Sequence, residues 1–114
     1  MSGTGGGNGG GSGGGGGAHR ECPDFFEETV LNSPNHIVLA NLEEGDLLSV
    51  YLNDEGGHST VLAVDGDGNS AGSITIGSLA QLIECLEDGY DYVAVVVSVD
   101  GGHCRVQIRL ESDL

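Results

Sequence analysis

The sequence contains no lysine and no tryptophan, and its only cations, Arg20, Arg105 and Arg109, face eighteen acidic residues. The net charge is −15 at pH 7. A protein that binds nucleic acid through phosphates needs clustered lysine and arginine to release counterions. The composition therefore argues against ordinary DNA or RNA binding and favours a partner with a basic protein surface.

Long apolar runs are also missing. No window holds the roughly 18 uninterrupted apolar residues of a membrane helix, and the N-terminus lacks the basic start and apolar run of a secretory signal. The three cysteines, Cys22, Cys85 and Cys104, cannot all pair within one chain, and an odd count favours reduced thiols. These features predict a cytoplasmic protein without a membrane segment.

Glycine is concentrated at the N-terminus, where it makes up twelve of residues 1–17. Such a segment has no apolar surface to offset the entropy of ordering a chain. We therefore expect residues 1–20 to form a disordered tail. Residues 21–114 are then left for a single acidic domain, which is large enough for one modest core.

The pattern after residue 42 predicts a β-rich fold. Alternating apolar residues, separated by turn sequences at 54–57 and 65–69, predict three strands in an antiparallel meander, at residues 46–53, 59–65 and 71–76. Residues 90–100 contain a continuous valine run, typical of a strand covered on both faces. This strand and residues 104–110 predict a final hairpin, with Arg105 and Arg109 on one exposed face.

One helix is predicted at about residues 78–88. Its apolar residues follow the i, i+3, i+4, i+7 spacing of a buried stripe: Leu79, Leu82, Ile83 and Leu86. Ser78 and Gln81 have the spacing of a capping box, and Gly89 supplies a left-handed stop. The fold class is therefore mainly β (α+β), a small antiparallel β-barrel or strongly curved sheet of 5–6 strands with this one capping helix.

Residues 24–41 allow more than one interpretation. The stretch after Asp24 fits either a short helix or an edge strand that ends before Pro34, and residues 37–40 could form another short strand. Because Phe25 and Phe26 are the only phenylalanines, we expect at least one of them to enter the core.

Four segments together resemble a known family. They are L-x-x-G-D-x-L at 42–48, V-L-A-V-x-x-x-G-x-x-A-G-S-I at 61–74, L-x-x-L-I-x-x-L-x-x-G at 79–89, and Y-x-A-V-V-V at 92–97 followed by a Gly-Gly turn. This pattern resembles the HIRAN-like domains, small β-barrels with a single helix set between barrel strands. The resemblance implies recognition of the 3′ end of single-stranded DNA, or a module beside helicase and nuclease domains. Gly56-Gly57-His58 stand where that family has an Asn- and Asp-containing stretch.

Two sets of residues have the composition of metal sites. Asp65, Asp67 and Asn69 match the first three ligand positions of a calcium loop, but Ile76 stands where such a loop has its bidentate Glu. A simple hairpin turn is the alternative. The second set contains the nitrogen and sulfur ligands that zinc prefers, from His19, Cys22, Cys85, His103 and Cys104. The alternative for Cys85, beside the helical stripe, is a small core residue.

The sequence predicts no catalytic residues and no cofactor. Cys104 and His103 supply a nucleophile and a base, but neighbours along a strand point to opposite faces. We expect a non-enzymatic interaction or adaptor module, whose partner-binding residues are Glu43, Glu44, Asp46, Arg105 and Arg109. Two alternatives stay open: the DNA 3′-end binding that the family implies, and an acidic DNA mimic that inhibits a nucleic-acid-binding protein.

Overall fold

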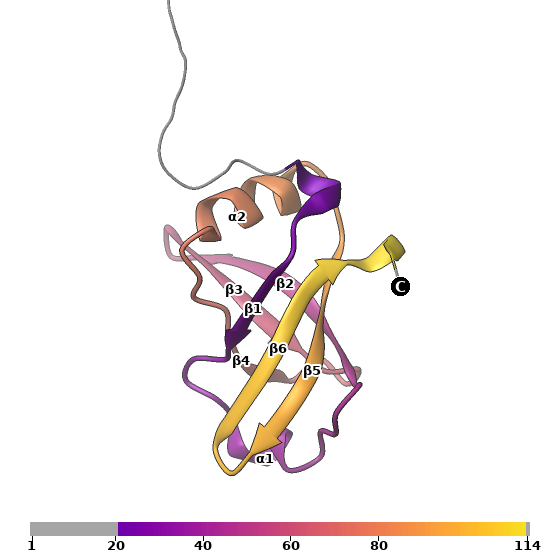
Figure 1. The fold of residues 1–114 in the computed structure, drawn as a ribbon. Coiled ribbons are helices and arrows are strands. Elements are labelled where there is room, and N and C mark those ends of the chain that lie inside the picture. The colour runs from indigo at the N-terminus through magenta and orange to yellow at the C-terminus, as the bar shows by residue number, and fades with distance from the viewer. Residues whose placement is uncertain (1–20, 114) are drawn as a thin grey trace, which may run out of the picture.

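The computed structural model describes residues 21–113, and the tail predicted for residues 1–20 lies outside this range. Six strands form one antiparallel sheet in the order β1-β6-β5-β2-β3-β4. The sheet curls strongly, and short helices lie at its two ends (Figure 1). The mainly β fold class with one capping helix is thereby confirmed.

The bounds of the elements, in chain order, are η1 (Cys22–Asp24), β1 (Glu27–Val30), α1 (His36–Leu39), β2 (Leu47–Glu55), β3 (His58–Val64), β4 (Ser70–Ser73), α2 (Leu79–Glu87), β5 (Tyr92–Asp100), β6 (His103–Leu110) and η2 (Glu111–Asp113). Strands β2 to β6 fall on the five segments predicted as strands, although β4 ends before Ile76. Of the two interpretations of the stretch after Asp24, the edge strand is the one that forms, as β1. The short strand considered for residues 37–40 was wrong, because α1 forms there.

An N-cap explains why α1 forms a helical turn. The side chain of Asn35 accepts hydrogen bonds from the backbone N–H groups of Ile37 and Val38, at 3.0 and 3.4 Å. These two groups have no partner within the first turn of a helix, so an Asn at this position stabilises it. Val38 and Leu39 then face the core, while Ile37 is 79% exposed.

The two edge strands of the sheet meet at a single bridge. Asn32, which follows β1, and Ser73, the last residue of β4, exchange two backbone hydrogen bonds of 2.8 Å. Gly72 permits this approach, because a Cβ there would lie 3.0 Å from the Cβ of Leu31. Apart from this bridge, no backbone pairing within residues 21–113 joins β1 to β4. The sheet is therefore a curled half-barrel.

The concave side of the sheet forms the core. Its fully buried side chains come mainly from several strands and from α2, and include Leu48, Val61, Ile74, Leu82, Val96, Val106 and Ile108. Phe25 is 2% exposed, which confirms that one phenylalanine enters the core, while Phe26 remains on the surface. No charged side chain among residues 21–112 is buried.

Helix α2 covers one end of the half-barrel, and its apolar stripe is confirmed. Leu82 is fully buried and lies beside the equally buried Cys85, while the other members of the stripe are half-buried against the core. The predicted capping box was wrong, since the Ser78 side chain makes no capping hydrogen bond and its hydroxyl donates to Glu27 instead, at 3.4 Å. The left-handed stop is correct, because Gly89 has a φ of 98°.

Candidate functional site

An acidic groove of about 290 Å³ opens at the α1 end of the half-barrel. It is lined by Val38, Asn41, Leu42, Asp46, Leu47, Leu48, Asp65, Gly66 and Asp67. Glu43 and Glu44 lie in the same loop as Asp46 and are exposed. The structure thus brings three predicted partner-binding residues, Glu43, Glu44 and Asp46, to the same end as Asp65 and Asp67. We call the hollow and these five acids together the acidic groove.

Hydrogen bonds within the loop and to β5 hold the loop that carries Glu43, Glu44 and Asp46 in place. The Asp46 carboxylate accepts the N–H of Glu43 at 2.8 Å. The N–H of Gly45 donates to the carbonyl of Val96 on β5, and the N–H of Val96 donates to the carbonyl of Asp46, both at 2.8 Å. Gly45 has a φ of 94°, a conformation that favours glycine. The loop is therefore anchored to the sheet, and the Glu43 and Glu44 side chains extend outward from it.

The β3–β4 turn supplies the other two acids. One oxygen of Asp65 accepts the backbone N–H groups of Asp67 and Asn69, each at 2.9 Å, and the backbone N–H of Asp65 donates to the carbonyl of Asn69. This arrangement is an Asx-type turn, in which the carboxylate replaces a backbone acceptor. The candidate calcium residues therefore form the hairpin turn that was their alternative interpretation.

The arginines predicted to bind the partner lie elsewhere. Arg105 and Arg109 do share the outer face of β6, as predicted, but each contacts a neighbour on the molecule itself. The Arg105 guanidinium lies 3.4 Å from a carboxylate oxygen of Glu28, and that of Arg109 lies over the Phe26 ring, 6.0 Å from its centroid. The predicted partner-binding set is therefore divided between the acidic groove and β6.

A second groove, of about 880 Å³, runs along β1. Its lining includes Arg105, Glu28, His103 and His36. The His36 ring lies against Gly102, where an added Cβ would be 2.6 Å from a ring carbon. No local pattern in the sequence marks His36, because its proximity to the β5–β6 turn exists only in the folded chain.

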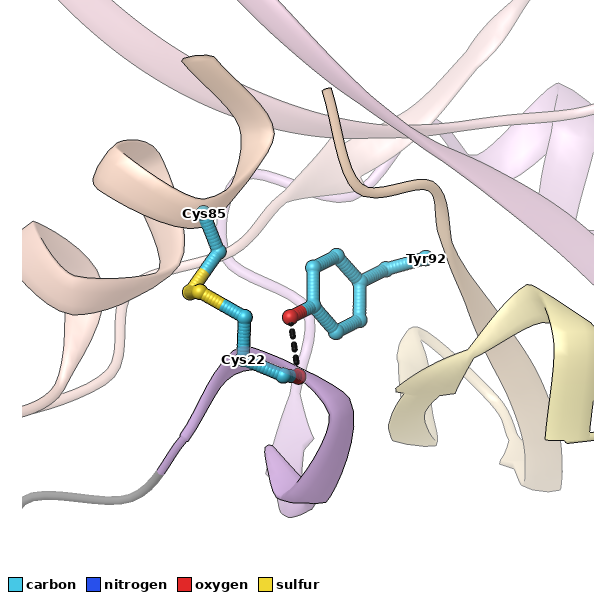
Figure 2. Close-up of a disulfide and its surroundings, with 3 residues drawn as sticks. All are labelled: Cys22, Cys85 and Tyr92. Atoms are coloured by element: carbon cyan, nitrogen blue, oxygen red, sulfur yellow. Dashed lines mark hydrogen bonds between the residues drawn. A yellow bond between two sulfur atoms is a disulfide. The ribbon is translucent and has the colours of Figure 1, made fainter. Parts of the chain in front are cut away.

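The cysteines correct the prediction of reduced thiols. Cys22 in η1 and Cys85 in α2 form a disulfide (Figure 2), with a Cα–Cα distance of 5.6 Å. Cys104 is free and buried. An odd count requires one unpaired cysteine, but it does not prevent the other two from pairing. Their proximity could not be read from the sequence, since 63 positions separate them.

Tyr92 lies beside this disulfide. Its hydroxyl donates a hydrogen bond to the carbonyl of Cys22 (Figure 2). Its ring packs edge-on against Phe25, with 5.8 Å between the ring centroids. Burial, with a smaller contribution from the Tyr90 phenolate, raises the pKa of Tyr92 to about 12. The segment around Cys22 is therefore fixed to the core by a covalent bond, a hydrogen bond and an aromatic contact.

The structure does not assemble the candidate zinc ligands. The sulfurs of Cys22 and Cys85 are bonded to each other, Cys104 faces the core while His103 is exposed, and His19 lies outside the described residues. Among residues 21–113, no group of three or more His, Cys, Asp or Glu side chains is placed to hold a metal ion. Burial also raises the pKa of the Cys104 thiol, so the nucleophilic thiolate is disfavoured.

Comparison with protein-family models, with curated proteins and with solved structures finds no match to this chain. The resemblance to HIRAN-like domains therefore stays a prediction from the sequence. The longest helix within residues 21–113 has nine residues, which is far too short to cross a bilayer.

Proposed function

We propose that this domain is a non-catalytic interaction module that binds a basic protein surface through the acidic groove. The observation that carries this proposal is the distribution of charge. All eighteen acids of the sequence lie within residues 21–113, which contain two arginines. Five of these acids gather at the α1 end, where Asp46, Asp65 and Asp67 line one groove, so a basic partner would be attracted to that groove over a Debye length of about 8 Å.

The state of the arginines supports a protein partner over a nucleic acid. Phosphate contacts require cations that are free to meet the backbone. Arg105 is already paired with Glu28, and Arg109 lies against Phe26. A polyanion would therefore have to displace these contacts while it approached a strongly negative surface.

The exposure of the carboxylates supports binding over catalysis. Catalytic groups act from sites where burial and neighbouring charges shift their pKa values. Within residues 21–112 every carboxylate is at least partly exposed, and the buried Tyr92 and Cys104 have raised pKa values that disfavour their nucleophilic anions. Such a scaffold presents its acidic groups on the outer surface.

The test is a binding titration with a basic probe. The probe is a helical peptide of about 18 residues, or five turns, built from lysine and glutamine. We expect saturable binding that weakens as salt rises. The triple variant Glu43→Gln, Glu44→Gln, Asp67→Asn should bind at least about fivefold more weakly at low salt. The matched control is Glu84→Gln, Glu87→Gln, Asp88→Asn, in α2 and at its C-cap. It removes the same charge at the other end and should retain most of the affinity.

Two results would contradict the proposal. The first is no binding of the peptide by the unmodified protein at low salt. The second is saturable binding of single-stranded DNA with a free 3′ end, lost in Arg105→Ala or Arg109→Ala. That second result would favour the DNA 3′-end binding implied by the resemblance to HIRAN-like domains.

The predicted cytoplasmic location has its own test. Disulfides persist in oxidising compartments and are rare in the cytosol. Rapid alkylation of thiols in intact cells would show whether Cys22 and Cys85 are bonded there. A reduced pair would support the cytoplasmic location, and an oxidised pair would exclude a reducing compartment.

A further inference from the structure

The convex side of strands β2 and β3 carries large apolar side chains that are exposed to solvent. Leu47 is 54% exposed and Tyr51 is 56% exposed, and alternation along β2 places both on the side opposite the core. Tyr51 pairs across the sheet with Leu62, which is half-buried on the same side, as is Val64. Tyr51, Leu62 and Val64 line a hollow of about 430 Å³. We call these four residues the apolar face.

The pairing of β2 and β3 decides what kind of element could cover this face. β2 is paired with β5 over residues 47–49 and with β3 from Ser49 onward, and β3 is paired with both β2 and β4 over residues 62–64. This segment of β3 has no free edge, so a partner cannot add a strand beside it. A partner must cover the side chains themselves, which is how an amphipathic helix packs on a sheet.

The charge around the apolar face decides the chemistry of that helix. The β3–β4 turn separates the hollow from the acidic groove: Gly68 and Ser70 line the hollow, while Asp65 and Asp67 line the groove. Leu47 belongs to both the apolar face and the groove lining. A helix seated on the apolar face would therefore have carboxylates along one side, which lysine or arginine side chains would complement.

We propose that the apolar face and the acidic groove form one docking surface for a basic amphipathic helix of a partner protein. Its apolar stripe covers Tyr51 and Leu62, and its cationic residues meet Asp67 and Glu43. An apolar centre with a charged rim is the common arrangement of protein interfaces, and tyrosine is enriched among their energetically dominant residues. This inference rests on the proposed function and adds to it the apolar contact and the helical form of the partner.

The experiment compares two peptides of equal charge. The first is the lysine–glutamine peptide, and the second has leucine in place of glutamine along one helical stripe, a change that alters helix propensity little. We expect the leucine peptide to bind at least about tenfold more tightly, because it buries apolar surface on Tyr51. In Tyr51→Ser this preference should fall to about twofold or less, while Tyr90→Ser, which alters an exposed tyrosine in the α2–β5 loop, should retain it.

A thermal melt shows whether Tyr51→Ser is folded, and Leu47→Ser provides the same test if it is not. The inference is overturned if the unmodified protein binds both peptides equally, or if the folded variants keep the full preference for leucine. In those cases binding of both peptides would leave the proposed function standing. If the lysine–glutamine peptide does not bind at low salt, the proposed function itself fails, whatever the leucine peptide does.

Discussion

The two ends of the half-barrel are built in different ways. At one end, α2 buries Leu82 and Cys85, and the disulfide to Cys22 joins the helix to the N-terminal segment above Tyr92. At the other end, α1 is a single turn, and the neighbouring loops present exposed carboxylates. The comparison indicates that the α2 end holds the fold together, whereas the exposed acids of the α1 end, Glu43, Glu44 and Asp67, can change at little cost to stability. An end of the second kind is suited to binding.

The largest effect should come from the disulfide. It closes a loop with a sequence separation of 63 residues, and restricting an unfolded loop of this size stabilises the native state by about 4 kcal/mol. Replacing Cys22 and Cys85 by serine should lower the free energy of unfolding by about that amount, as measured by urea denaturation. An unchanged midpoint would mean that the bond does not hold the α2 end together.

Removing the main apolar contact of α2 should have a comparable effect. Leu82→Ala deletes a fully buried side chain and should cost about 2 to 5 kcal/mol. Glu84→Ala, on the exposed side of the same helix, is the control and should change the unfolding free energy by less than about 0.5 kcal/mol. Equal effects at the two positions would contradict the assignment of the buried side.

The α2 end should also lose stability in alkali. Tyr92 has a pKa near 12 in the folded protein and about 10 when unfolded, so the unfolded chain loses its proton first. Stability is then fully present below pH 10 and falls through pH 12, by roughly 3 kcal/mol. The raised pKa of the Cys104 thiol acts in the same direction. Tyr92→Phe isolates the contribution of the tyrosine, and its melting temperature should decline less over this pH range.

A smaller effect is expected at the α1 end. Asp65→Ala removes the acceptor of two backbone N–H groups in the β3–β4 turn and should cost about 1 to 2 kcal/mol. Asp67→Ala is the control, because Asp67 contributes its backbone N–H to the turn, which alanine keeps, while its side chain only lines the groove. If Asp65→Ala destabilised the protein as much as Leu82→Ala, the contrast between the two ends would be lost.

Local patterns predicted most of the secondary structure. Strands β2, β3 and β6 and helix α2 are each buried on one side, so their apolar residues repeat at the period of the element. This gives the alternation in the strands and the stripe of α2. The glycine stop at Gly89 was equally readable. The capping box was not, because the Ser78 hydroxyl has a competing partner, Glu27, which is remote in the sequence.

The candidate site was only partly predictable. Glu43, Glu44 and Asp46 are adjacent in the chain, but their proximity to Asp65 and Asp67 depends on the pairing of β2 with β3 and on the placement of α1. The apolar face does have a signal in the sequence, which is an excess of apolar residues in β2 and β3. Apart from Ser49, residues 47–52 and 61–64 are all apolar, which is more than a strand buried on one side requires.

The sequence by itself determined the class of fold, the turns and the negative charge, because these depend on composition and on patterns within a few neighbouring residues. Only the tertiary structure decided which cysteines bond, which phenylalanine is buried and where the acids gather. Each of these depends on contacts between residues far apart in the chain. The bridge between Asn32 and Ser73, made possible by Gly72, is the clearest example of such a contact, because it joins the two edge strands of the curled sheet.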